Sequence, residues 1–142
     1  MDTGRWEAIV DGMFAKVYAD SGDHGKAIEH GESSARLRHW IGDSDGEAYA
    51  LTALAHCWQG LGEHDRAIAH CWQAIALGRA SLGNQDDLAP PLAVLAVSLH
   101  HLGRIHEPLA CWREAAAIYA ERGLDTDAAA IRRHLRQRAM TV

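Results

Sequence analysis

The chain has 142 residues, of which 48% are hydrophobic, and a formal net charge of -5 at pH 7. This length suffices for one globular domain but not for two with separate cores, and the negative charge argues against nucleic-acid binding, which needs a basic face. No apolar run reaches the roughly eighteen residues of a membrane span, and residues 1–6 lack the features of a signal peptide, so we expect a cytoplasmic protein without membrane contact.

The cysteines and the basic residues point to a reducing compartment and a bacterial origin. Cys57, Cys71 and Cys111 are odd in number, and their spacings match no disulfide framework. Arginine far outnumbers lysine, which occurs only as Lys16 and Lys26. Together with the richness in alanine and glycine, this bias is typical of a GC-rich bacterial gene.

Apolar residues recur at intervals of three and four through the chain, the spacing of amphipathic helices. The predicted helices, in chain order, span residues 5–20, 24–40, 46–60, 64–81, 88–102, 106–122 and 126–138. Gly22, Gly62 and Gly103 follow alternate helices, where a left-handed residue is expected to end the helix. The prolines are compatible with this assignment because Pro90, Pro91 and Pro108 fall in first helical turns, where no intrahelical donor is lost.

Polar loops separate successive pairs of helices. Residues 43–47, 84–87 and 125–127 are rich in carboxylates and amides. Such side chains accept hydrogen bonds from the unpaired amide groups at a helix start. We therefore interpret these loops as helix caps.

The pairs of helices are copies of one another. The stretch from Leu54 to Gly62 aligns with that from Leu95 to Gly103, and a weaker copy lies upstream around Phe14. Residues 1–142 therefore form one predicted repeat domain, with units at about 5–42, 46–83 and 88–123 and a capping helix at about 126–138.

These units resemble the tetratricopeptide repeat. The Leu-Ala pair of the first helix (Leu54-Ala55), the large residue three positions later (Trp58) and the following Gly62 carry the resemblance, as do small residues such as Ala67 in the second helix. The resemblance implies an all-α, right-handed α-α superhelix of three hairpins plus the capping helix. The long period, about 40 residues, resembles that of kinesin light chains and of the carboxy-terminal repeats of Streptomyces antibiotic regulatory protein-type transcriptional regulators.

The resemblance also implies a function. Such repeats hold a peptide or helix of a partner protein on the concave face formed by the first helices. The implied residues are Lys16, Tyr49, Thr52, His56, Gln59, Ala93, Val97, His100 and His101. One lysine and no asparagine lie on this face, which argues against a carboxylate clamp and leaves a neutral surface. The resemblance also implies that the module is part of a bacterial transcriptional or signalling regulator. The alternative is a surface that is merely solvated, or one packed by neighbouring repeats of a longer parent protein.

Two other functions stay open. Self-association into a homo-oligomer is one, because a short array leaves two end faces uncovered. A metal-binding sensor is the other, because His56-Cys57 and His70-Cys71 lie on adjacent antiparallel helices, although buried thiols are the favoured interpretation of both cysteines.

Catalytic motifs are lacking. The stretch 22–27 is without the strand and hydroxyl residue of a phosphate loop. The stretch 43–46 is similar to a calcium loop but lacks its third ligand and a glutamate at the required distance. We therefore expect no enzyme activity and no cofactor. Trp58 and Trp112 are predicted core residues, and a partly exposed tryptophan elsewhere would mark an interface.

Overall fold

A computed structural model of the chain describes residues 3–80, 88–104 and 106–121, together with the single residues 129, 132, 133 and 136. These ranges contain six helices and no strand. The helices are α1 (Thr3–Asp20), α2 (His24–Trp40), α3 (Ser44–Gly60), α4 (His64–Ala80), α5 (Ala89–His101) and α6 (His106–Glu121). The predicted all-α fold is confirmed, and the helix predicted at 126–138 lies outside the continuously described ranges.

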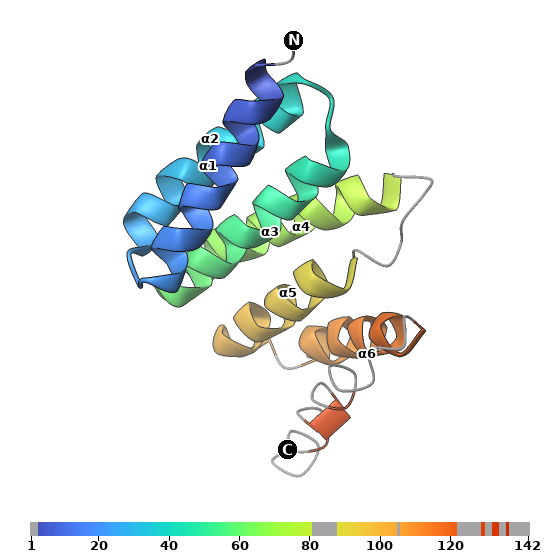
Figure 1. Ribbon diagram of the computed structural model, residues 1–142. Coiled ribbons are helices and arrows are strands. Elements are labelled where there is room, and N and C mark those ends of the chain that lie inside the picture. The colour runs from blue at the N-terminus through green and yellow to red at the C-terminus, as the bar shows by residue number, and fades with distance from the viewer. Residues whose placement is uncertain are drawn as a thin grey trace.

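The helices pair into three hairpins that stack in chain order, α1 with α2, α3 with α4, and α5 with α6 (Figure 1). Each of the second helices α2 and α4 also packs against the first helix of the next hairpin, α2 on α3 and α4 on α5. The first helices α1 and α3 meet at only a few residues. Part of α2 is therefore accessible between them.

Glycine ends the helices as the sequence predicts. Gly22, Gly62 and Gly103 have φ angles of 86°, 78° and 76°, and Gly42 has 77°, all in the left-handed region that side chains disfavour. The amide of Gly62 donates to the carbonyl of Gln59 at 3.0 Å, and the amide of Glu63 donates to the carbonyl of Trp58 at 2.9 Å. These bonds satisfy carbonyls at the end of α3.

Aspartate side chains begin the helices that follow two of these turns. Asp23 Oδ1 accepts a hydrogen bond from the Lys26 amide at 3.1 Å, and Asp43 Oδ1 accepts one from the Gly46 amide at 3.0 Å. The predicted cap within 43–47 is thus confirmed at Asp43, whereas 84–87 and 125–127 lie outside the described ranges. The predicted proline positions at the start of α5 are also confirmed.

Two apolar clusters form the core of the described residues, one at each junction between hairpins. The cluster between the second and third hairpins is centred on Leu92, Leu95 and Leu99, each at most 1% exposed. The cluster between the first and second is centred on Leu51 and Leu54 of α3. Each junction between neighbouring hairpins therefore has its own apolar cluster, as expected of repeats that contact mainly their neighbours.

The two tryptophans predicted in the core differ in how deeply they are buried. Trp112 is 3% exposed, which confirms the prediction for α6. Trp58 is only half-buried, and it contacts both clusters. The guanidinium carbon of Arg66 lies 4.6 Å from its ring centre, so one face of this ring meets a cation in place of apolar side chains.

Close helix packing at the junctions depends on glycine. A methyl group added to Gly31 of α2 would lie 2.9 Å from Cδ2 of Leu54, and one added to Gly78 of α4 would lie 2.7 Å from Cδ2 of Leu88. Both distances are well inside normal van der Waals contact. The absence of a side chain at these two positions therefore sets how near the next hairpin can come.

Candidate functional site: a groove along the first helices

A groove of about 670 Å³ runs along the first helices of the hairpins. The first helices supply most of its lining, and α2 and α4 contribute small residues together with one arginine, Arg38 of α2. The lining residues of α1 and α2 are Gly12, Ala15, Lys16, Ala19, Asp20, Ala27, Gly31, Ser34 and Arg38. Those of α3, α4 and α5 are Asp45, Gly46, Ala48, Tyr49, Ala50, Thr52, Ala53, Leu54, His56, Cys57, Ala74, Gly78, Pro90 and Val94.

The chemistry of this lining is mainly apolar and small. Glycine and alanine predominate, so the groove is wide where other helices would place larger side chains. Tyr49 rises from its α3 wall and is 71% exposed. Lys16 and Arg38 are balanced by Asp20 and Asp45, which leaves the groove without an excess of either charge.

The nine residues predicted for the concave face fall into two groups in the structure. Lys16, Tyr49, Thr52 and His56 line the groove. The other five lie outside its lining, at and near the junction of the second and third hairpins. They are Gln59, Ala93, Val97, His100 and His101. A role of either group in binding a partner stays a prediction.

The second group takes part in contacts within the chain. Gln59 Nε2 donates to the Val94 carbonyl and to Ser98 Oγ, both at 2.9 Å, which ties α3 to α5. The His101 ring stacks on that of His64, with centres 4.6 Å apart and planes 7° from parallel. Val97 packs against the neighbouring core cluster. These side chains thus help to hold the third hairpin on the second.

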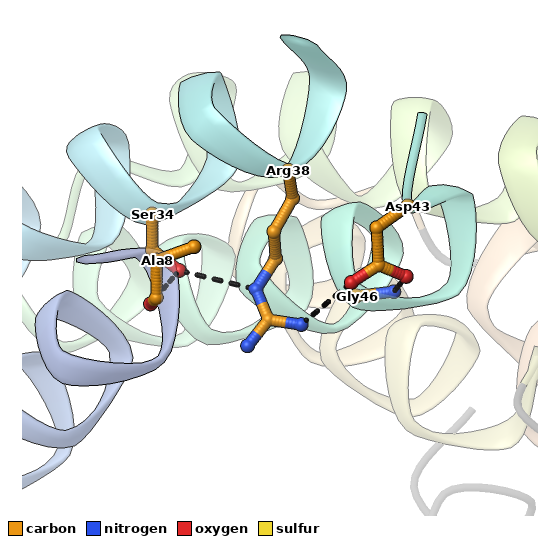
Figure 2. A network of polar contacts seen from close by, with 5 residues as sticks. All are labelled: Ala8, Ser34, Arg38, Asp43 and Gly46. Carbon is orange, nitrogen blue, oxygen red and sulfur yellow. Dashed lines mark hydrogen bonds and ion pairs between the residues drawn. The ribbon is translucent and has the colours of Figure 1, made fainter. Parts of the chain in front are cut away.

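A polar network fixes one arginine in the groove wall (Figure 2). Arg38 Nε donates to Ser34 Oγ at 3.3 Å, and its Nη1 donates to Asp43 Oδ2 at 3.1 Å. Ser34 Oγ in turn donates to the Ala8 carbonyl at 2.9 Å. Because Asp43 also caps α3 through the Gly46 amide, the network joins α1, α2 and the start of α3.

Glycine at position 46 makes room for this network. A methyl group there would overlap both the Arg38 guanidinium and the Asp43 carboxylate. The Arg38 side chain is 19% exposed. Within the described ranges its Nη2 has no hydrogen-bond partner, so a donor remains for a ligand in the groove.

The sequence-based prediction did not include Arg38, because it assigned the face to first helices alone. A signal was present in the sequence. Arg38 stands five positions before Asp43, an aspartate at the start of the next helix, which is a spacing that lets the two side chains pair across the turn.

The cysteines lie in the core. Cys57 and Cys71 are 5% and 0% exposed and belong to different clusters, which confirms the prediction of buried thiols. Burial, and to a lesser degree the neighbouring Cys111, raises the pKa of Cys71 to about 12. His70 Nδ1 donates to the Arg66 carbonyl at 2.8 Å, whereas His56 lines the groove. No group of three potential metal ligands gathers in the described part of the chain.

None of the described helices combines the length and the apolar character needed to span a bilayer.

Comparison with known proteins identifies the fold. The sequence matches no protein-family model, and no curated protein matches it. Among solved structures, the chain is similar to the nearly identical TPR-like repeats of a Podosopora anserina protein assigned as a kinesin light chain. The TM-score is 0.70 and the sequence identity 18%, and the match covers 84% of this chain and 58% of that chain. A point variant of that protein gives a TM-score of 0.69 and 18% identity, with coverage of 84% and 57%. This chain thus spans somewhat more than half the length of each, and its hairpins have the TPR-like repeat fold.

Proposed function

We propose that the chain is a protein-interaction module that holds an amphipathic helix of a partner protein in the groove. The observation that supports this proposal is the groove of about 670 Å³, lined by small residues from successive hairpins. Small side chains leave space that large apolar side chains of a partner would fill. A helix presents such residues along one face at intervals of three and four, which suits a groove that runs along helices.

Polar groups of the groove would orient the helix. Arg38 offers its remaining guanidinium nitrogen, which suits a partner carboxylate or a carbonyl at the end of a helix. Tyr49 and His56 offer exposed hydrogen-bonding groups beside the apolar lining. Because Lys16 and Arg38 are offset by acidic residues, we expect a partner of low net charge with a single acidic anchor.

A displayed library of amphipathic helical peptides tests the proposal. Selected peptides should carry large apolar residues at helical spacing and should bind the Tyr49→Glu variant at least tenfold more weakly, since the new charge would meet their apolar face. The matched control is Trp72→Glu, which alters a half-exposed aromatic residue of α4 outside the groove and should leave affinity unchanged. Selected peptides that bind both variants equally would contradict the groove as the binding site.

We further propose that the module works in the cytoplasm within a larger bacterial transcriptional or signalling regulator, without catalysis of its own. The resemblance of the long-period repeats to those of such regulators supports this context. Purification of the regulator from its native host, followed by identification of the domains joined to or bound by the chain, tests it. An enzyme partner unconnected with signalling or transcription would contradict it.

Self-association is the second candidate function. The observation that favours it is a row of exposed apolar side chains on the outward face of α1, the first helix of the stack. Such a row is larger than the scattered exposed apolar residues of ordinary protein surfaces. Light scattering at high protein concentration tests it, and a strict monomer would exclude it.

A further inference from the structure

The outward face of α1 is apolar along most of its length. Its large side chains are half-exposed or more, at 64% for Trp6, 46% for Val10, 64% for Met13, 47% for Phe14 and 61% for Val17. Their spacing of three and four places them on one side of the helix. Two alanines at other positions of the helical wheel, 8 and 15, are buried against the rest of the first hairpin.

The repeat shows what this face is built to contact. Three of the exposed positions, Val10, Phe14 and Val17, have equivalents one repeat later in α3 and two repeats later in α5. The equivalents in α3 are Ala50, Leu54 and Cys57, and those in α5 are Pro91, Leu95 and Ser98. All six are buried. Both helices pack on the preceding hairpin, α3 on α2 and α5 on α4. The part of the α1 face formed by Val10, Phe14 and Val17 therefore has the position and character of a helix-packing surface, whereas the equivalents of Met13, Ala53 and Val94, line the groove.

We infer that a second copy of this chain covers the face, with the two α1 helices packed against each other. This inference rests on self-association, the second candidate function, and is independent of the groove. Within the described ranges, the helix-packing faces of α2 and α4 are already occupied by α3 and α5, so a second copy cannot offer them. Among the large apolar side chains that are exposed in the described ranges, α1 carries five and no other helix carries a comparable row, so the outward face of α1 itself is the apolar helix face that a second copy can offer.

The distribution of side chains along α1 favours an antiparallel, two-fold arrangement. With the symmetry axis midway along the row, Trp6 of one copy lies opposite Val17 of the other, and Val10 lies opposite Met13. Larger side chains then meet smaller ones, which permits close packing of two helices. Each contact occurs twice, as in any interface formed by the same surface of both subunits.

The size of the face sets the expected strength. The five side chains expose on the order of 500 Å² per copy, so a dimer would bury about 1,000 Å², near the lower limit for a specific interface. We therefore expect a reversible dimer whose dissociation constant is in the micromolar range.

Sedimentation equilibrium of the whole chain at concentrations from about 1 to about 500 µM, which bracket such a dissociation constant, tests the inference. The wild-type chain should shift from monomer to dimer across this range, and Met13→Glu should stay monomeric because it buries two carboxylates near the symmetry axis. Since Met13 is strongly exposed, this change should leave the fold intact, as circular dichroism will verify. Trp72→Glu is the matched control and should dimerise like the wild type. A wild-type chain that is monomeric throughout, or a dimer that persists in Met13→Glu, would overturn the inference.

Cross-linking tests the orientation. At a rise of about 1.5 Å per residue, the two copies of residue 10 are offset by about 5 Å along the antiparallel helices and the two copies of residue 17 by about 16 Å. A bis-maleimide of about 10 Å span, between these two offsets, should therefore join the Val10→Cys chains but not the Val17→Cys chains. Joining of both variants would indicate parallel helices and refute the arrangement. Tyr49→Glu should dimerise normally, so failure of the groove proposal and failure of this one are distinguishable.

Discussion

Replacement of Gly31 by alanine measures how closely the second hairpin packs on the first. Alanine in a helix interior is favoured over glycine by about 1 kcal/mol. Against this gain, the new methyl group would lie 2.9 Å and 3.2 Å from two carbons of Leu54, which is only 2% exposed and has little room to move. Overpacking of a core typically costs about 1–3 kcal/mol. The sum of the two effects makes Gly31→Ala destabilising by up to about 2 kcal/mol.

Gly12→Ala is the matched control, because it makes the same change in the interior of α1 where space exists. Its methyl group would lie 3.6 Å from Ser34 Oγ, an ordinary contact. The helix-propensity gain is common to both variants, so their difference isolates the overpacking cost of about 1–3 kcal/mol. With a urea dependence of about 2 kcal/mol per molar, the unfolding midpoints should differ by roughly 0.5–1.5 M. A Gly31→Ala chain as stable as Gly12→Ala would refute the packing of α2 on α3.

Two further expectations follow from the polar and thiol groups. Asp43→Ala should lower the free energy of unfolding in urea by about 1–2 kcal/mol, which is more than Asp23→Ala should lower it. The reason is that Asp43 both caps α3 and pairs with Arg38, whereas Asp23 only caps α2. Equal losses in the two variants would show that the ion pair adds nothing. Cys71 should resist alkylation in the folded chain at pH 8, since its raised pKa keeps the thiol protonated and it is wholly buried. The pKa of Cys71 is about 12 in the folded chain and near the ordinary 9.0 in the unfolded chain, so the free energy of unfolding should fall as the pH rises from 9 towards 12. Labelling of Cys71 in the native state at pH 8, mapped by mass spectrometry, would contradict the first expectation, and a free energy of unfolding that stays constant above pH 9 would contradict the second.

Local signals made the helices and turns predictable. Glycine at 22, 62 and 103 and aspartate at 43 act through their own backbone or the first helical turn, so their effect can be predicted without knowledge of the fold. The core position of Trp112 followed from repeat spacing in the same way. The helix ends in particular depend on neighbours within a few residues along the chain.

The groove depends on how the hairpins cross, which helical spacing does not reveal. Because α1 and α3 barely meet, Ser34 and Arg38 of the second helix line the groove although that face was assigned to first helices. Gln59 occupies a predicted face position, but its amide reaches across to Val94 and Ser98 of α5. Both outcomes arise from tertiary contacts between residues far apart in the sequence.

The central claim is that a partner helix lies in the groove along α1 and α3. Titration of the ¹⁵N-labelled chain with a peptide from the helical library, followed by amide chemical shifts, tests it most directly. We predict that the largest shifts will map to groove residues such as Lys16, Tyr49 and Arg38, with Trp72 unaffected. Shifts centred on Trp72 and the exposed side of α4, with the groove amides unchanged, would contradict the claim.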